Sequence, residues 1–252
     1  MLARLKAMLR KSPLGRLRSR LLAPRIPRSQ NGEADVLDGI LSWLEVPRSF
    51  VEFGFHPDEF NCARLVDRFD GLLIDGEPEA VGQARRVFGK NITPVCQFLD
   101  LGHLDVIRDF CRTRPLGILS IDVDGNDYWF LEALIGLRPA VVIVEYNASL
   151  GLRPLSVPYD KMFVRHARHE SGWYHGASLT ALDQLCGRSG YDLVAVAPGG
   201  CNAFFVRADL SAPARRRAPG QVYLENALRN EWSKTTAATQ WERIKDLPYV
   251  SI

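Results

Sequence analysis

The sequence predicts an α/β protein: a Rossmann-like, doubly wound sheet of about seven strands with a terminal antiparallel hairpin, a basic N-terminal arm and a helical C-terminal tail. The first observation is that short apolar runs alternate with amphipathic segments after Pro47. The second is that the runs within 117–125 and 140–147 end in acidic residues, as buried parallel strands do beside a ligand crevice. The third is the tight turn 198–200, because two strands joined by so short a turn must be antiparallel.

Each element follows from the period of its apolar residues. Apolar runs predict strands at 50–55, 71–75, 92–98, 118–123, 140–144, 191–197 and 202–207. Amphipathic segments between and around them predict helices at 33–45, 58–69, 79–87, 104–111, 128–135, 178–186 and 222–232. The segment 148–176 breaks this rhythm, since it is polar, contains proline and carries three histidines. A long irregular stretch in a compact domain is usually functional or disordered.

The chain divides into three parts. Residues 1–32 form a basic arm and linker, residues 33–210 the α/β domain, and residues 211–252 a C-terminal extension. A chain of 252 residues can bury one sizeable core. Lys and Arg number 32 against 29 Asp and Glu, but nine of the basic residues lie within 1–30, where there is no acid. The remainder is therefore net acidic, which argues against a nucleic-acid partner.

The arm, residues 1–28, alternates basic with apolar side chains. Its pattern is compatible with contact with an anionic membrane surface or a partner, but a solvated, partly disordered arm is the favoured interpretation. It lacks the apolar stretch of a secretory signal, and no uncharged apolar run reaches the ~18–20 residues of a membrane span. The five cysteines are odd in number and have no C-x-x-C spacing. That usage predicts free thiols and a cytoplasmic location, and it makes a zinc site unlikely.

Four polar side chains end the two acidic runs: Asp122, Asp124, Glu145 and Asn147. Neighbouring parallel strands end at one edge of a sheet, so these side chains are expected around one crevice. Alternation along an extended chain points Glu145 and Asn147 to the same side. Two carboxylates in one crevice repel unless a cation or a proton lies between them. The pattern predicts either a divalent cation or acid–base chemistry, and helix capping is the structural alternative.

The order of elements and several local motifs resemble the class I S-adenosylmethionine-dependent methyltransferases. The strings Phe-Val-Glu-Phe-Gly-Phe at 50–55 and Leu-Leu-Ile-Asp-Gly-Glu-Pro-Glu at 72–79 are similar to the first and second motifs of that family. The chain also resembles the FkbM-like and sugar O-methyltransferase branch of that family, in the strings at 122–128, 145–147, 174–179 and 202–207. The resemblance covers about residues 48–210. It departs from the family's G-x-G-x-G, of which only Gly54 is present.

The resemblance implies that S-adenosylmethionine is the cofactor. Glu52, Phe53 and Gly54 would lie near its methionine part. Asp75, followed by Gly76, would accept hydrogen bonds from the ribose hydroxyls. Residues 97–100, which end in Asp100, stand where the family contacts adenine.

The resemblance also implies methyl transfer to a hydroxyl of a saccharide or a similar polyhydroxylated acceptor. Asp122 and Glu145 match metal-ligand positions of catechol O-methyltransferase-like enzymes, and Asn147 is displaced by one residue from the third. These three residues would hold Mg²⁺ or a similar divalent cation. His175 is the expected general base, with Asp122 and Asp124 as further catalytic residues and His56 as a weaker candidate.

Aromatic residues near the same segment are candidates for stacking on a sugar ring: Trp129, Trp173 and Tyr174. The alternative is that these aromatics belong to the core. The sequence does not name the acceptor, and it leaves a homodimer open.

Two other functions fit parts of the pattern. The string Asp-Val-Asp-Gly at 122–125 also resembles the nucleophile motif of haloacid-dehalogenase phosphatases, although Asn126 stands where that family continues with Thr. The missing glycines after Gly54 suit a non-catalytic cofactor-binding or scaffold protein. A Rossmann-like sheet whose strand-end acids only cap helices is the structural alternative, because a fold does not fix a function.

Overall fold

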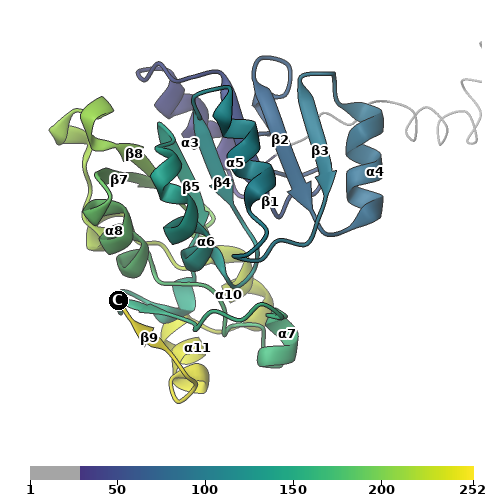
Figure 1. Cartoon of the computed structure of the whole chain (residues 1–252). Coiled ribbons are helices and arrows are strands. Elements are labelled where there is room, and N and C mark those ends of the chain that lie inside the picture. Colours follow the sequence, from purple (N-terminus) through teal and green to yellow (C-terminus); the bar gives the residue numbers. More distant parts are fainter. Residues whose placement is uncertain (1–28) are drawn as a thin grey trace, which may run out of the picture.

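The computed structural model describes residues 29–252, so the predictions made for the arm, residues 1–28, lie outside the described residues. A seven-stranded sheet runs through the centre of the molecule in the order β3-β2-β1-β4-β5-β8-β7 (Figure 1). Its strands are β1 (Ser49–Phe53), β2 (Asp70–Asp75), β3 (Ile92–Cys96), β4 (Ile118–Ile121), β5 (Val141–Glu145), β7 (Tyr191–Val196) and β8 (Asn202–Arg207). Strands β1 to β5 are parallel, and β8 runs antiparallel between β5 and β7. The predicted fold class, with its terminal hairpin, is confirmed.

The sheet is covered by helices on both faces, since its strands are apolar on both sides. Residues of β5 alternate between the two cores: Val142 and Val144 belong to one, Val141 and Ile143 to the other. The first core is closed by α5 (Asp105–Arg112), α6 (Asp127–Leu134) and α8 (Leu179–Arg188); the second is closed by α3 (Glu33–Leu41) and α4 (Pro78–Val87). This three-layer packing leaves the ends of the sheet as the places where polar side chains can gather.

One predicted helix is wrong. Residues 58–69 form a loop with a single 3₁₀ turn, η1 (Ala63–Leu65), and no α-helix. The buried carboxylate of Glu52 explains the difference, because it accepts the backbone N–H groups of Asn61 at 2.7 Å and Cys62 at 2.8 Å. Amides bound in this way are not available to a helical hydrogen-bond ladder.

The C-terminal extension lies beyond the carboxyl ends of the parallel strands, beside the segment that follows β5 (Figure 1). The predicted helix at 222–232 is split into α9 (Pro219–Val222) and α10 (Ala227–Ser233), and α11 (Ala237–Ile244) follows. The last strand, β9 (Val250–Ser251), pairs antiparallel with β6 (Leu155–Ser156). Neither β6, β9 nor α7 (Arg165–Arg168) is predicted by the sequence, since each is too short to show a period.

The remaining short turns are 3₁₀ helices: η2 (Ile135–Leu137), η3 (Ala148–Leu150), η4 (Ala208–Leu210) and η5 (Pro213–Arg215). All five cysteines are free thiols, as predicted. Within residues 29–252 there is no helix with the length and apolar character needed to cross a membrane.

Candidate active site

Two neighbouring cavities open at the carboxyl edge of the sheet. The smaller, of about 310 Å³, is lined by the ends of β1 and β2 and by the loop after β3. The larger, of about 600 Å³, is lined by the end of β5, the start of β8, the loop that contains α7, and α10. Asp122 and Asp124 line both cavities, so the two spaces meet at the end of β4. A shared wall of this kind is what a reaction between two bound molecules requires.

Gly54 brings β1 and β4 into close contact beside the smaller cavity. Its backbone has φ +78°, and a Cβ built on it would lie 1.5 Å from the carbonyl oxygen of Asp122. Only glycine fits such an approach, and it allows the chain to turn away from the strand there. Gly54 and Phe53 line the smaller cavity, as the resemblance implies for cofactor-binding residues.

Asp75 and Gly76 line the same cavity at the end of β2. The Asp75 carboxylate accepts the backbone N–H of Glu77 at 2.7 Å, which fixes its rotamer. Partial burial raises the pKa of Asp75 above its ordinary value. Phe98 lines the same cavity and is 65% exposed, which is unusual for a phenylalanine.

Two predicted cofactor residues do not line the smaller cavity. Glu52 is buried under the loop that follows β1, where it binds backbone amides; burial raises its pKa to about 7, and those hydrogen bonds lower it in part. Asp100 is paired with Lys161 at 3.0 Å and with His103 at 2.8 Å, and these two partners lower its pKa to about 2. The structure therefore gives both carboxylates structural contacts, and their predicted role toward the cofactor has no support from their position.

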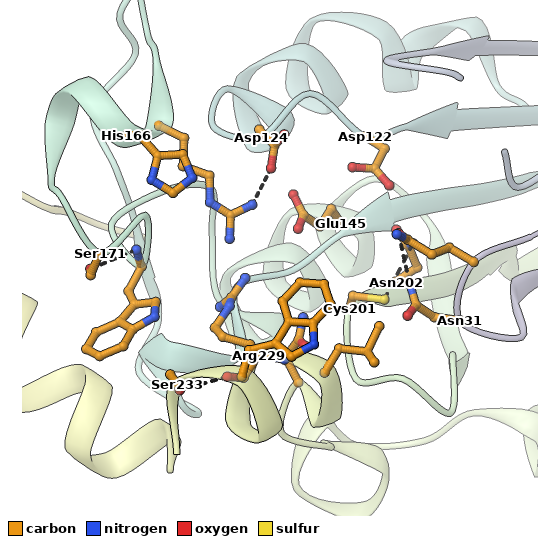
Figure 2. Close-up of a pocket in the computed structure, with 16 residues that line it drawn as sticks. Asn31, Asp122, Asp124, Glu145, His166, Ser171, Cys201, Asn202, Arg229 and Ser233 are labelled. Carbon is orange, nitrogen blue, oxygen red and sulfur yellow. Dashed lines mark hydrogen bonds and ion pairs between the residues drawn. The ribbon is translucent and has the colours of Figure 1, made fainter. Parts of the chain in front are cut away.

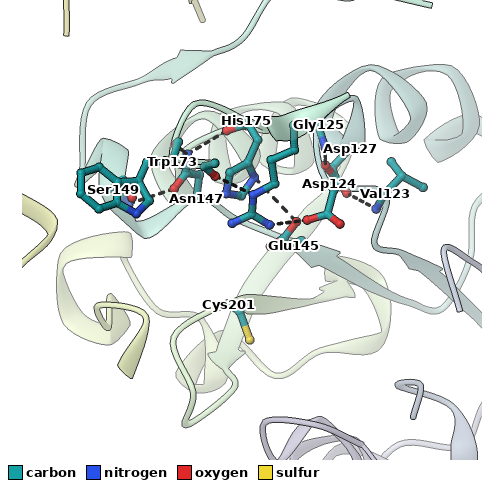
Figure 3. A network of polar contacts seen from close by, with 12 residues as sticks. Val123, Asp124, Gly125, Asp127, Glu145, Asn147, Ser149, Trp173, His175 and Cys201 are labelled. Atoms are coloured by element: carbon teal, nitrogen blue, oxygen red, sulfur yellow. Dashed lines mark hydrogen bonds and ion pairs between the residues drawn. The ribbon is translucent and has the colours of Figure 1, made fainter. Parts of the chain in front are cut away.

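The acids at the ends of β4 and β5 form a cluster. Burial, followed by the charge of Glu145, raises the pKa of Asp122 well above its ordinary value. Burial, followed by the charge of Asp124, raises the pKa of Glu145 to about 8. Asp127 accepts the backbone N–H groups of Val123 at 2.9 Å and Gly125 at 3.0 Å (Figure 3). Asp127 is therefore a structural carboxylate. In residues 29–252, no backbone N–H group donates to the carboxylate of Asp122 or Glu145.

Two arginines that the sequence does not single out supply positive charge to this cluster. Arg165 forms an ion pair with Asp124 and donates to the Gly172 carbonyl at 2.6 Å. Arg229, from α10, lies deep in the larger cavity (Figure 2). Burial, followed by the charge of Arg165, lowers the pKa of Arg229 to about 10. The repulsion expected between strand-end carboxylates is thus reduced by guanidinium groups.

His175 lies behind the larger cavity and is fully buried. Its Nε2 atom is 2.9 Å from Arg229 Nη2, and its Nδ1 atom is 3.8 Å from Glu145 Oε2. A guanidinium can only donate, so Nε2 must accept and the neutral ring carries its hydrogen on Nδ1. Burial lowers the pKa of His175 well below its ordinary value. The predicted general base is thus a neutral residue that lines neither cavity.

Asn147 is also buried and fully engaged (Figure 3). Its Nδ2 donates to the carbonyls of Trp173 at 2.7 Å and His175 at 2.8 Å, and its Oδ1 accepts from Ser149 and Arg229. An oxygen bound by a guanidinium is a poor position for a cation. No group of three or more His, Cys, Asp and Glu side chains in residues 29–252 could hold a metal ion. Because Arg229 occupies Asn147 Oδ1, the predicted set of Asp122, Glu145 and Asn147 does not fit Mg²⁺.

Of the predicted aromatic residues, only Trp173 lines the larger cavity. Trp129 donates to the Val157 carbonyl, and Tyr174 donates to the Pro248 carbonyl. His56 lines neither cavity. Sequence reasoning missed Arg165, Arg229, Asn202 and Trp232, which line the larger cavity. The Asn at the start of the predicted strand 202–207 and the Trp in a predicted C-terminal helix were the available signals.

No family model matches the chain, and no curated protein matches it. Similar folds occur among solved structures. The N-terminal domain of EvdMO1, in the presence of SAH and D-fucose, aligns over 75% of this chain and 84% of its own with 15% identity and a TM-score of 0.46. The plantazolicin methyltransferase BpumL in complex with SAH aligns over 70% and 82% with 15% identity and a TM-score of 0.46. Magnesium protoporphyrin IX methyltransferase from Synechocystis PCC 6803, with bound SAH, aligns over 70% and 83% with 13% identity and a TM-score of 0.43.

Proposed function

We propose that the protein is an S-adenosylmethionine-dependent O-methyltransferase that acts on a hydroxyl of a saccharide or a similar polyhydroxylated acceptor. The observation that supports it most is the pair of cavities that meet at Asp122 and Asp124. One molecule held beyond β1 and β2 would face a second held beyond β5 and β8 across these two residues. Strand order and cavity position agree with the rule that ligands of open α/β sheets bind beyond the carboxyl ends of the strands.

The smaller cavity offers the groups that a nucleoside requires. Asp75 ends β2, the strand next to β1, and its fixed carboxylate would accept hydrogen bonds from ribose hydroxyls. The exposed ring of Phe98 would stack on adenine. The backbone at Phe53 and Gly54 would border the methionine part, since Gly54 has no side chain to block it. When bound, S-adenosylmethionine would supply an electrophilic methyl group on its sulfonium.

Asp122 is the residue we assign as general base. It lines both cavities, and no hydrogen bond or ion pair from residues 29–252 occupies its carboxylate. Asp124, in contrast, is held by Arg165. Asp122 would take the proton of the acceptor hydroxyl while the oxygen bonds to the methyl carbon and the carbon–sulfur bond breaks. A carboxylate whose pKa is raised by burial is a stronger base for this task.

Calorimetric titration with SAH tests the cofactor assignment without knowledge of the acceptor. Asp75→Ala should weaken SAH binding by roughly tenfold or more, because each charge-assisted hydrogen bond is worth about 1.5–3 kcal/mol. The matched control is Glu79→Ala, an exposed acid in the first turn of α4 that lines neither cavity. Absence of SAH binding to the unmodified protein would refute the proposal. Hydrolysis of p-nitrophenyl phosphate by such a protein would instead favour the phosphatase alternative.

A further inference from the structure

The side chain of Asn202 is held in one orientation at the start of β8. Its Nδ2 donates to Glu33 Oε1 at 3.2 Å, and Glu33 is itself buried in the first turn of α3. A carboxylate only accepts, so the amide nitrogen must face Glu33 and the amide oxygen must face the other way. Asn202 Oδ1 is nevertheless buried without a hydrogen-bond partner in residues 29–252. A buried acceptor of this kind costs free energy unless a ligand or water satisfies it.

Glu145 is the cross-strand neighbour of Asn202 and offers a second acceptor. The two residues are directly opposite one another in the antiparallel pairing of β5 and β8. Opposite residues of an antiparallel pair present their side chains on the same face, about 4.5–5.5 Å apart at Cβ. Glu145 Oε2 lies 3.8 Å from His175 Nδ1, whereas no hydrogen bond from residues 29–252 reaches Glu145 Oε1, and both Glu145 and Asn202 line the larger cavity. Figure 2 shows Asp122, Glu145 and Asn202 on one side of this cavity, with His166 and Ser171 across from them.

The charges around Asn202 and Glu145 determine which hydrogen-bond donors of a ligand can bind there. Arg165 and Arg229 both line the cavity, and both act on the charge of Glu145. An ammonium group placed at Glu145 would be repelled by the two guanidinium groups. Neutral hydroxyl groups meet no such repulsion, and they can donate to Asn202 Oδ1 and to Glu145 Oε1.

An aromatic wall completes the cavity. Trp232 of α10 is 78% exposed and lines the cavity. An indole face offers a large apolar surface to the C–H face of a sugar ring. We propose that Asn202 and Glu145 bind two neighbouring hydroxyls of a saccharide ring while Trp232 stacks on that ring. This inference rests on the proposed function, and it assigns the acceptor site to residues of β5, β8 and α10.

Saturation-transfer NMR with a panel of methyl hexopyranosides, recorded in the presence of saturating SAH, tests the assignment. At least one glycoside should receive saturation from the unmodified protein. Its affinity should fall roughly threefold to tenfold in Asn202→Leu and in Trp232→Ala, since each change removes one contact of moderate strength. The matched control is Met162→Ala, which removes an exposed apolar side chain that lines neither cavity.

Calorimetry with SAH on the same variants separates this inference from the proposed function. SAH affinity should be unchanged in all three variants, which also shows that each is folded. Trp232 is on the surface, so its variant remains informative if Asn202→Leu fails to fold. Glycoside binding that persists unchanged in Trp232→Ala would overturn the assignment. SAH binding without any glycoside signal would overturn the saccharide site and leave the cofactor assignment intact, whereas loss of both would refute the proposed function.

Discussion

Arg229 Nη2 donates to His175 Nε2 over 2.9 Å, so the ring nitrogen that a general base would use is already bound to a cation. The same guanidinium donates to Asn147 Oδ1 at 2.8 Å and to Ser149 Oγ at 3.0 Å. Arg229 thus joins α10 to the loop after β5 and holds the floor of the larger cavity. His175 and Asn147, which the sequence places at the reaction itself, act as supports for Glu145 and for that loop.

Replacement of Arg229 should be destabilising. Arg229→Met would leave the buried Nε2 of His175 without its donor, and it would remove one hydrogen bond each from Asn147 Oδ1 and Ser149 Oγ, which keep their other partners. Each unsatisfied buried group costs about 1–3 kcal/mol, so the free energy of unfolding should fall by at least that amount. Chemical denaturation measures the change, with Arg108→Met as an exposed control on α5 that should alter it by less than about 0.5 kcal/mol. Equal stability of the two variants would contradict this role for Arg229.

Gly54→Ala should be among the most destabilising single changes in the sheet. The new Cβ would lie 1.5 Å from the carbonyl oxygen of Asp122, and the backbone has a left-handed φ of +78°. Since backbone must move to relieve the contact, we expect a loss of more than about 2 kcal/mol in the free energy of unfolding. Gly187→Ala is the matched control, because a Cβ at this position of α8 would meet nothing within 4 Å. That change should stabilise the helix by up to about 1 kcal/mol.

Apolar periodicity located all the strands of the main sheet, because buried parallel strands are continuous apolar runs that need no knowledge of distant residues. It placed Asp122 and Glu145 at one cavity for the same reason. It did not find Arg229, whose contact with Asn147 spans 82 residues and depends on how the C-terminal extension folds back. It also predicted a helix at 58–69, since the competing hydrogen bonds come from Glu52 on a separate strand. Local sequence patterns cannot predict secondary structure or site residues that depend on a single polar contact between residues far apart in the chain.

Glu52 should make the protein less stable as pH rises. An acid in a surface ion pair has the opposite effect, because its pKa is lowered by folding. Burial raises its pKa from 4.5 to about 7, so between these values the folded protein keeps a proton that the unfolded chain releases. Stability from this group is therefore full below about pH 4.5 and is lost as pH rises through about 7. The effect is roughly 3 kcal/mol at most. Denaturation across this range should show a steeper fall of stability in wild type than in Glu52→Gln, which keeps the other buried acids; parallel curves would contradict the burial of an ionisable group at Glu52.

Mg²⁺ should neither stabilise the protein nor be needed for methyl transfer. The sequence led to a cation because Asp122 and Glu145 share a crevice, but Arg165 and Arg229 already supply positive charge to it. Asn147, the third predicted ligand, has its oxygen bound to Arg229. A ligand that binds only the folded state raises the melting temperature in proportion to its occupancy, so a magnesium titration followed by thermal unfolding reports binding directly. We expect no shift in wild type, and none in Asp122→Asn. A rise that depends on Mg²⁺ in wild type and is lost in Asp122→Asn would show that the carboxylates hold a metal after all, and that the arginines move aside to admit it.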